Sequence, residues 1–445
     1  MTRRSLLISI RGSLWFTPVL LLVMGSSLAL GLVYIDRRFI AEIATNWPPW
    51  LTAGPEAARQ MLSAITGSMI TVTGVVFSIT IVSLSLASNQ FSPRVLRSFM
   101  RDRVNQLVLG VLVGVFAYGL LVLQSVRSDS VVFVPQLALW CGIALSLVAL
   151  GFLIAFLHHT AVSIQASEIV ARLARETVHA WRTTRSLHAT YRSPSPATDN
   201  GKPSTAITSP TTGYIQDIAL EELEAIARRL DVTLEVVHGI GDFAIEGQAL
   251  VHARGAASLA PRDRAEVQGC FGVNAYRTID QDPAFGMRQI VDIATKALSP
   301  GINDTTTAIH CIDYLGAILH EVVHPAEKGT EVKGEDEREP SRVRLNLPDP
   351  AHFLDLGFHE IRQHARGNVS VLLRLSRSLR GLVVARSEPA AREAALKHLD
   401  LLYTAAETVP CAQDRAIVLE SLRDVTDTVS RTGRPIADRA SALRR

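Results

Sequence analysis

The stretch MLSAITGSMITVTGVVFSITIVSLSLAS, residues 61–88, decides the fold class of this chain. It contains no Asp, Glu, Lys, Arg or His. A helix needs about 20 consecutive apolar residues to cross the roughly 30 Å hydrocarbon core of a bilayer. Because this stretch exceeds that length without a charge, it predicts a transmembrane helix.

Three further stretches have the same character, at residues 13–35, 104–126 and 131–157. None of them contains Asp, Glu, Lys or Arg. The chain is therefore expected to carry about four transmembrane helices in its N-terminal third. Charges within a membrane usually mark proton relays and coupled carriers, so their absence disfavours a pump. A passive pore, a sensor and a scaffold all stay open.

Arginine placement predicts the orientation of these spans. Arg3, Arg4 and Arg11 precede the first span, whereas the loops after the first and third spans have balanced charges. Positive charge collects on the cytoplasmic side of a membrane. We therefore expect a multi-pass membrane protein with both termini and the loop between spans two and three in the cytoplasm. That loop carries the expected cytoplasmic-interface residues Arg94, Arg97, Arg101 and Arg103.

The second span is unusual because eight Ser and Thr residues lie between positions 66 and 85. At 100° per residue they and the glycines form two stripes. Small residues let helices approach closely, and hydroxyl groups bond between helices, so one interpretation is packing inside the bundle. The other interpretation is a hydroxyl-lined pore in a homo-oligomer. One stripe holds Gly67, Thr71, Gly74, Ser78 and Ser85, the other holds Thr66, Thr73 and Thr80, and the third span offers Gly110 and Gly114 for packing.

The rest of the chain has the composition of a soluble protein. Net charge over all 445 residues is only +3, and no dense basic block predicts nucleic-acid binding. The four cysteines are far apart and form no Cys-x-x-Cys, so a disulfide framework is not expected. No Walker loop, dinucleotide motif or Gly-x-Ser-x-Gly occurs, so no cofactor is predicted.

Element patterns predict a membrane all-α N-terminal bundle, then a cytoplasmic α+β module, then a helical bundle. Periodicity of two between residues 213 and 253 indicates short strands, with a helix from about 220 to 230. About four helices follow residue 350. The expected domains are 1–165 in the membrane, 166–212 as a polar helix and flexible linker, 213–324 as the α+β module, 325–350 as a charged loop and 351–445 as the helical domain.

A sharp turn is predicted between two helices of the cytoplasmic part. Pro300 and Gly301 suit the central positions of a type II turn, and either Asn303 or Asp304 is expected to cap the next helix. The turn that begins at Ser299 is interpreted as a connector. The alternative is that amide groups at the start of the second helix bind an anion.

His320-Glu321-Val322-Val323-His324 matches the His-Glu-x-x-His pattern of zinc peptidases. In that alternative His320 and His324 bind the metal and Glu321 is the catalytic base. The same residues form the polar face of an amphipathic helix, and a proline follows at once. The helix-face interpretation is favoured.

Five motifs carry a resemblance to a known family: residues 78–94, 99–107, 241–243 (Gly-Asp-Phe), 282–286 (Asp-Pro-Ala-Phe-Gly) and 297–304. With them, most of the chain resembles the bacterial predicted membrane proteins grouped as domain of unknown function 2254. The resemblance implies a bacterial inner-membrane protein and brings no known reaction, ligand or His-Glu-x-x-His motif.

The leading hypothesis is accordingly a non-enzymatic, oligomeric membrane protein that is channel-like or sensory, with a cytoplasmic regulatory module. The alternatives are the zinc peptidase and a scaffold that recruits a cytoplasmic protein partner.

Overall fold

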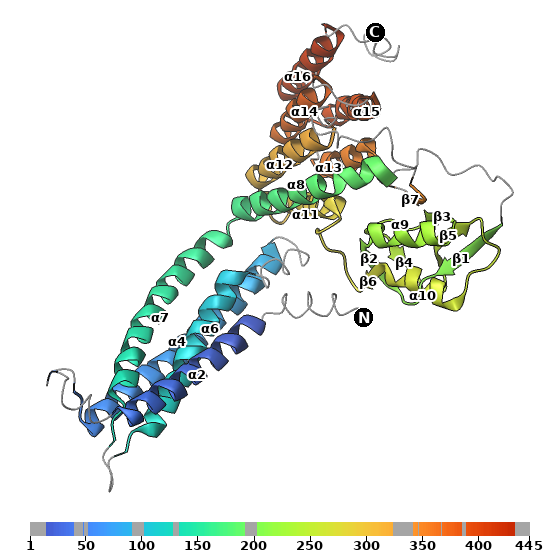
Figure 1. The fold of residues 1–445 in the computed structure, drawn as a ribbon. Coiled ribbons are helices and arrows are strands. Elements are labelled where there is room, and N and C mark those ends of the chain that lie inside the picture. Colours follow the sequence, from blue (N-terminus) through green and yellow to red (C-terminus); the bar gives the residue numbers. More distant parts are fainter. Residues whose placement is uncertain are drawn as a thin grey trace. The chain divides into compact units, whose positions relative to one another are not determined.

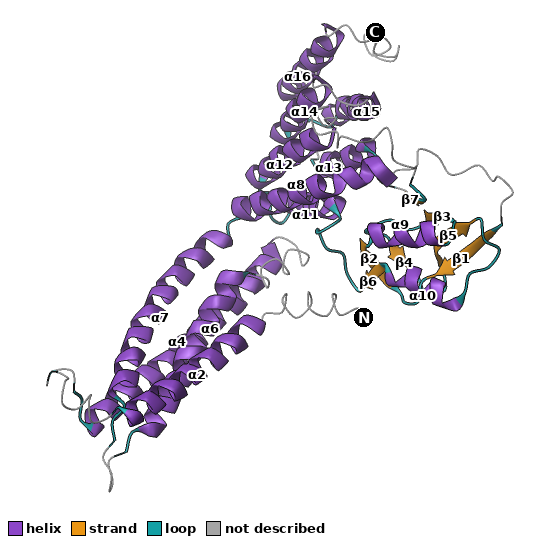
Figure 2. Cartoon of the chain, viewed as in Figure 1, coloured by secondary structure: helices purple, strands orange, loops and turns teal. Residues whose placement is uncertain are grey.

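A computed structural model describes residues 15–39, 48, 52–90, 102–127, 133–191, 203–323, 341–345, 347–365, 367–384 and 389–431. The chain divides into two compact units, residues 1–165 and 166–445 (Figure 1). All strands drawn in Figure 2 lie in the second unit, and the first is helical. The predicted fold class, a helical membrane bundle followed by an α+β region and further helices, is confirmed.

The first unit is built from helices α2 (Phe16–Arg38), α4 (Pro55–Gln90), α6 (Arg103–Ser125) and α7 (Gln136–Ser163). Within the described residues these four are long and apolar enough to cross a membrane. Helix α6 packs against α2, α4 and α7, which explains why it is the most buried of the four. At 1.5 Å per residue the 36-residue α4 is about 54 Å long and exceeds the hydrocarbon thickness.

Glycines set how closely these helices pack. A Cβ placed on Gly25 would lie 2.5 Å from the carbonyl oxygen of Gly114, so α2 and α6 meet backbone to backbone. Gly110 likewise faces Pro18 and Leu21 of α2. The packing role predicted for Gly110 and Gly114 therefore has a visible partner helix.

The end of the bundle where α2 stops and α7 starts is held by a buried carboxylate. Asp36 is 2% exposed and accepts hydrogen bonds from the amides of Leu137 (3.1 Å) and Ala138 (3.0 Å). It thus satisfies donors at the first turn of α7, which have no partner within their own helix. Asp36 lies just beyond the predicted first span, residues 13–35, because α2 continues to Arg38. The Gln136 side chain also accepts a hydrogen bond from the Ala53 N–H and donates one to the Ala53 carbonyl.

The second unit contains two sheets among its described residues. One has the order β1-β5-β3-β7, antiparallel except for the parallel pair β3–β7, and the other has the antiparallel order β4-β2-β6. A common core of Leu, Ile, Val and Ala side chains fills the space beneath helix α9. The strands are β1 (Ser204–Thr208), β2 (Gly213–Ile218), β3 (Thr233–Val236), β4 (Phe243–Ala244), β5 (Ala249–Arg254), β6 (Phe271–Asn274) and β7 (Val343–Leu345), with helices α9 (Leu220–Arg229) and α10 (Pro261–Gly269).

Two of these strands come from outside the module that periodicity indicates. β1 lies in a stretch expected to be linker, yet its residues alternate between exposed and buried as it pairs with β5. β7 returns after residues 324–340, which lie outside the described residues, and pairs in parallel with β3. Both therefore contribute apolar side chains, such as Ile207 and Val343, to the core of the sheet region.

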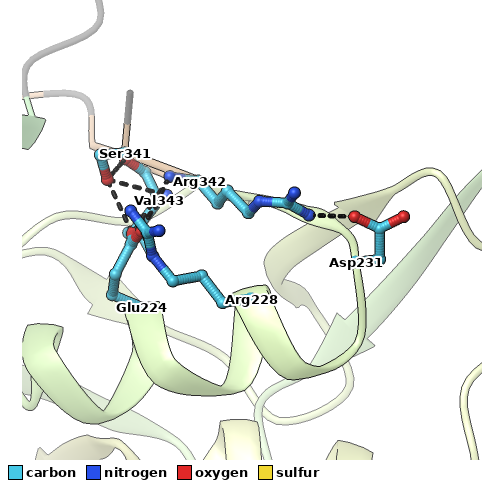
Figure 3. A network of polar contacts seen from close by, with 6 residues as sticks. All are labelled: Glu224, Arg228, Asp231, Ser341, Arg342 and Val343. Atoms are coloured by element: carbon cyan, nitrogen blue, oxygen red, sulfur yellow. Dashed lines mark hydrogen bonds and ion pairs between the residues drawn. The ribbon is translucent and has the colours of Figure 1, made fainter. Parts of the chain in front are cut away.

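Glu224 of α9 holds the start of β7 in place (Figure 3). Its carboxylate accepts hydrogen bonds from the Ser341 hydroxyl (2.7 Å) and from the amides of Arg342 and Val343 (both 3.1 Å). Arg228, one turn along α9, donates to the same carboxylate at 2.8 Å. This single side chain thus satisfies two backbone donors that the parallel pairing leaves without a partner.

The remaining helices of the second unit pack on one another through apolar faces. Helices α11 and α12 both contact α8, α11 also contacts α13, and α12 contacts α14. Leu315, Leu319 and Phe353 are examples of their fully buried side chains. The helices are α8 (Ala166–Tyr191), α11 (Pro283–Ala297), α12 (Thr305–Val323), α13 (Pro350–His364), α14 (Val369–Val384), α15 (Pro389–Ala406) and α16 (Ala412–Arg431).

Candidate functional site

The two polar stripes of α4 face in different directions. The Thr stripe turns inward: Thr66 is 5% exposed, and its hydroxyl oxygen lies 2.5 Å from the position that a Cβ on Gly119 of α6 would take. Thr73 and Thr80 are half-buried along the same face. The other stripe lies on the outside of the bundle, because all five of its members are exposed: Gly67, Thr71, Gly74, Ser78 and Ser85.

Part of the outward face of α4 forms a shallow, open groove of about 470 Å³, which includes Gly67 and Thr71 of the stripe. The groove is lined by Ser63, Ala64, Gly67, Ser68, Thr71 and Val72. The hydroxyl of Thr71 donates to the carbonyl of Gly67 at 2.9 Å, so its proton is satisfied within the helix. Its oxygen keeps acceptor capacity toward the groove.

The glycines of the outward stripe, Gly67 and Gly74, differ from the other bundle glycines that were predicted to pack. An ideal Cβ on Gly67 or Gly74 would meet no heavy atom within 4 Å, whereas Gly110 and Gly114 lie directly against α2. Glycines within a transmembrane helix commonly serve close helix contacts. The α4 face therefore has the composition of a packing surface, and no helix among the described residues of the chain covers Gly67 or Gly74.

At the other end of the bundle, α6 begins beside α7. Asp102 caps α6 by accepting from the amide of Val104 at 2.9 Å, and its second oxygen lies 2.6 Å from His159 Nε2. Arg103, the first residue of α6, is exposed. Arg94, Arg97 and Arg101, its predicted partners in a cytoplasmic interface, lie outside the described residues.

The turn from Ser299 to Asp304 joins α11 to α12. Asp304 is the cap: it accepts from the Thr307 amide at 3.0 Å and from the Thr307 hydroxyl at 2.5 Å, and these bonds lower its pKa. The left-handed residue is Asn303, with φ of 50°, and not Gly301. Since a type II turn at Pro300–Gly301 requires positive φ at the glycine, that turn type is wrong.

The His-Glu-x-x-His residues lie at the end of α12. Glu321 is paired with Arg182 of α8 through bonds of 2.8 and 3.2 Å, and the arginine lowers the pKa of the carboxyl group. His320 is exposed, and His324 lies outside the described residues. Over the ranges that the structure covers, no group of three His, Cys, Asp or Glu side chains is arranged to hold a metal. Glu321 therefore forms an ion pair that links α12 to α8.

Two short motifs that are distant in sequence meet at the start of α11. The first is Gly-Asp-Phe at 241–243, and the second is Asp-Pro-Ala-Phe-Gly at 282–286. Asp282 caps α11 by accepting from the Phe285 amide at 3.0 Å, and it pairs with Arg277 at 2.7 Å. Gly241, with φ of 90°, packs so closely that a Cβ would collide with the Asp282 carboxylate. Burial raises the pKa of Asp282, although Arg277 opposes that change. Sequence reasoning identified the Asp282 cap but not its contact with Gly241.

The second motif also places a glycine at a helix crossing. A Cβ on Gly286 of α11 would collide with the Thr177 hydroxyl of α8. The spacing from Asp282 to Gly286 thus serves two contacts, a capped helix start and a close approach to α8. The only available signal was the unusual Gly-Asp-Phe and Asp-Pro-Ala-Phe-Gly motifs themselves.

Comparisons with known proteins extend over nearly the whole chain. A family model described as predicted membrane protein, domain of unknown function 2254, matches residues 11–381. Proteins described as uncharacterised from Mycobacterium bovis and from Mycobacterium tuberculosis are each 31% identical over 445 residues, which is 97% of this chain and 83% of theirs. No solved structure matches the chain significantly.

Proposed function

We propose that this chain, which belongs to the family of predicted membrane proteins grouped as domain of unknown function 2254, is a channel-like protein. In the proposal it forms homo-oligomers in the bacterial inner membrane. In this proposal copies of α4 face one another and line a passive, uncharged path. The cytoplasmic unit regulates that path.

The exposed stripe of α4 is the observation that carries the proposal. Glycine and hydroxyl side chains gain little from contact with lipid, whereas they favour contact with another helix or with water. On this helix Gly67, Thr71, Gly74 and Ser78 all face outward, while the Thr66 stripe already serves the contact with α6. A second helix on the outward stripe would give the unpartnered glycines the same use that Gly114 has within the bundle.

The chemistry of the stripe favours passive movement of small solutes. No ionisable side chain lies on the stripe, so no proton relay is available there. Hydroxyl oxygens can replace part of the hydration shell of a passing ion without adding a charged group to the path. The arginines that flank the spans support an orientation with both termini in the cytoplasm.

Cysteine crosslinking tests whether α4 faces a second copy. Thr71→Cys and Ser78→Cys, in a background where Cys411 and Cys141 are replaced by Ser and Ala, are expected to form disulfide-linked dimers in native membranes. Val148→Cys on α7 is the matched control, because Val148 is 52% exposed but lies on an apolar face. Equal crosslinking at Val148 and Thr71, or none at either α4 position, contradicts the assembly.

Conductance recordings in liposomes test the path itself. The purified protein is expected to pass small ions, and Thr71→Leu or Ser78→Leu is expected to lower conductance by about tenfold or more because the leucine narrows and dries the path. Val148→Leu is expected to leave conductance unchanged. If the oligomers pass no ions, the channel proposal is wrong, and the stripe then serves only helix packing between copies.

A further inference from the structure

Two buried oxygen atoms in the membrane bundle have no hydrogen-bond partner among the described residues. They are Oδ1 of Asn105 on α6 and Oγ1 of Thr160 on α7. The two residues are only 5% and 6% exposed. A buried acceptor without a partner destabilises the folded state, and this cost calls for an explanation.

Helix geometry places Asn105 beside the inward stripe of α4. Thr66 of α4 meets Gly119 of α6, and the two helices run in opposite directions. Fourteen residues along each helix, about 21 Å or nearly four turns, lead to Thr80 and to Asn105 on the same facing sides. Val76 of α4 and Val108 of α6 share a buried cluster within that interval, so the helices remain in contact.

The same reasoning brings Thr160 to this level. Leu62 of α4 lies against Gly142 of α7, and these two helices run in the same direction. Eighteen residues further, which is five full turns, α4 reaches Thr80 and α7 reaches Thr160. Phe156, one turn before Thr160, belongs to the buried cluster that contains Val76. Three helices therefore direct neutral oxygen atoms toward one level of the bundle.

The oxygens at this level are an amide carbonyl and two hydroxyls. The Thr80 hydroxyl donates its proton to the Val76 carbonyl at 2.8 Å, which leaves its lone pairs free to accept. Hard cations prefer oxygen ligands. The carboxylate of Asp102 lies about one turn away, and the Val104 amide and His159 already engage it. Neutral ligands match a single positive charge better than a double one.

We propose that α4, α6 and α7 hold one monovalent metal cation, Na⁺ or K⁺, among Asn105 Oδ1, Thr160 Oγ1 and Thr80 Oγ1. The cation supplies the missing partner of both orphan oxygens, whose side chains are buried within the bundle. The site lies on the inward face of α4, opposite the Thr71 stripe, and does not depend on a pore between copies.

Thermal unfolding of the full-length protein in detergent tests the site. The protein is first exchanged into choline chloride, and NaCl or KCl then replaces the choline at constant ionic strength. A cation that binds only the folded bundle is expected to raise the midpoint by roughly 4 °C. Binding of ²²Na⁺ or ⁸⁶Rb⁺ is expected at about one ion per chain.

Asn105→Leu and Thr160→Val are nearly isosteric and remove one ligand each. Both are expected to abolish the cation response, and Asn105→Leu is expected to unfold in choline at or above the wild-type midpoint because no orphan carbonyl remains. Thr71→Val on the opposite face is the control and keeps the response. Equal midpoints in choline, Na⁺ and K⁺, the result for a site filled by water, would overturn the proposal, as would a full response in Asn105→Leu. If the liposome recordings show no conductance, the channel proposal fails, but the change of unfolding midpoint with Na⁺ or K⁺ is still expected.

Discussion

Replacing Glu224 by Gln is expected to loosen the start of β7. The Glu224 carboxylate is 15% exposed and accepts from the Ser341 hydroxyl, from the Arg342 and Val343 amides and from Arg228 (Figure 3). Gln keeps the shape but loses the charge and turns one acceptor into a donor that faces other donors. Hydrogen bonds to a charged group contribute about 1.5 to 3 kcal/mol, so we expect a loss of about 2 to 3 kcal/mol.

Hydrogen exchange measured by mass spectrometry on the full-length protein localises this loss. At about 1.4 kcal/mol per factor of ten, amides of β3 and of residues 341–345 should exchange roughly 30 to 150 times faster. Glu221→Gln, on the exposed face of the same helix, is the control and should change these rates less than about threefold. An unchanged rate in Glu224→Gln, or the same acceleration in α11 and α12, would refute the role given to this carboxylate.

The same carboxylate predicts a pH dependence. Burial raises the pKa of Glu224, but hydrogen bonds from Ser341, the Arg342 amide and Arg228 outweigh it, so the net pKa lies below the usual 4.5. A lowered folded-state pKa contributes stability above the unfolded value, and that contribution is lost as pH falls through the folded value. In the wild type, the protection of the β7 amides against hydrogen exchange should therefore decrease once the pH is lowered past about 4.5. In Glu224→Gln this pH-dependent decrease should be absent.

Three shorter predictions follow from other contacts. Gly241→Ala combines a positive φ with a collision against Asp282, so exchange in the first turn of α11 should rise by about tenfold or more, whereas Gly247→Ala, which meets no atom, should affect only its own turn. Asp36→Ala leaves two α7 amides unpaired and should lower the unfolding midpoint in detergent by roughly 5 to 10 °C, with Asp36→Asn intermediate. Glu321→Gln breaks an exposed pair with Arg182 and should leave the unfolding midpoint nearly unchanged, and removal of metal by chelation should not change the midpoint either; zinc-dependent unfolding would instead support the peptidase hypothesis.

Local contacts account for most of what the sequence predicted well. The four spans follow from length and apolarity, because a bilayer offers no partner for backbone groups and each helix must satisfy its own. The caps of α11 and α12, Asp282 and Asp304, are likewise local, since an N-cap accepts from an amide two or three residues away.

Tertiary packing decided what periodicity left open. Both stripes of α4 have the same residue types, and only the position of α6 shows that the Thr66 stripe is inside and the Thr71 stripe outside. The burial of Asp36 depends on the start of α7, about a hundred residues further along the chain. The pairing of Glu321 with Arg182, the contact of Gly241 with Asp282 and the addition of β1 and β7 to the sheet all join segments distant in sequence. Such contacts form only when distant segments of the chain come together in the folded state. A local sequence pattern contains no information about which distant segment will be the neighbour.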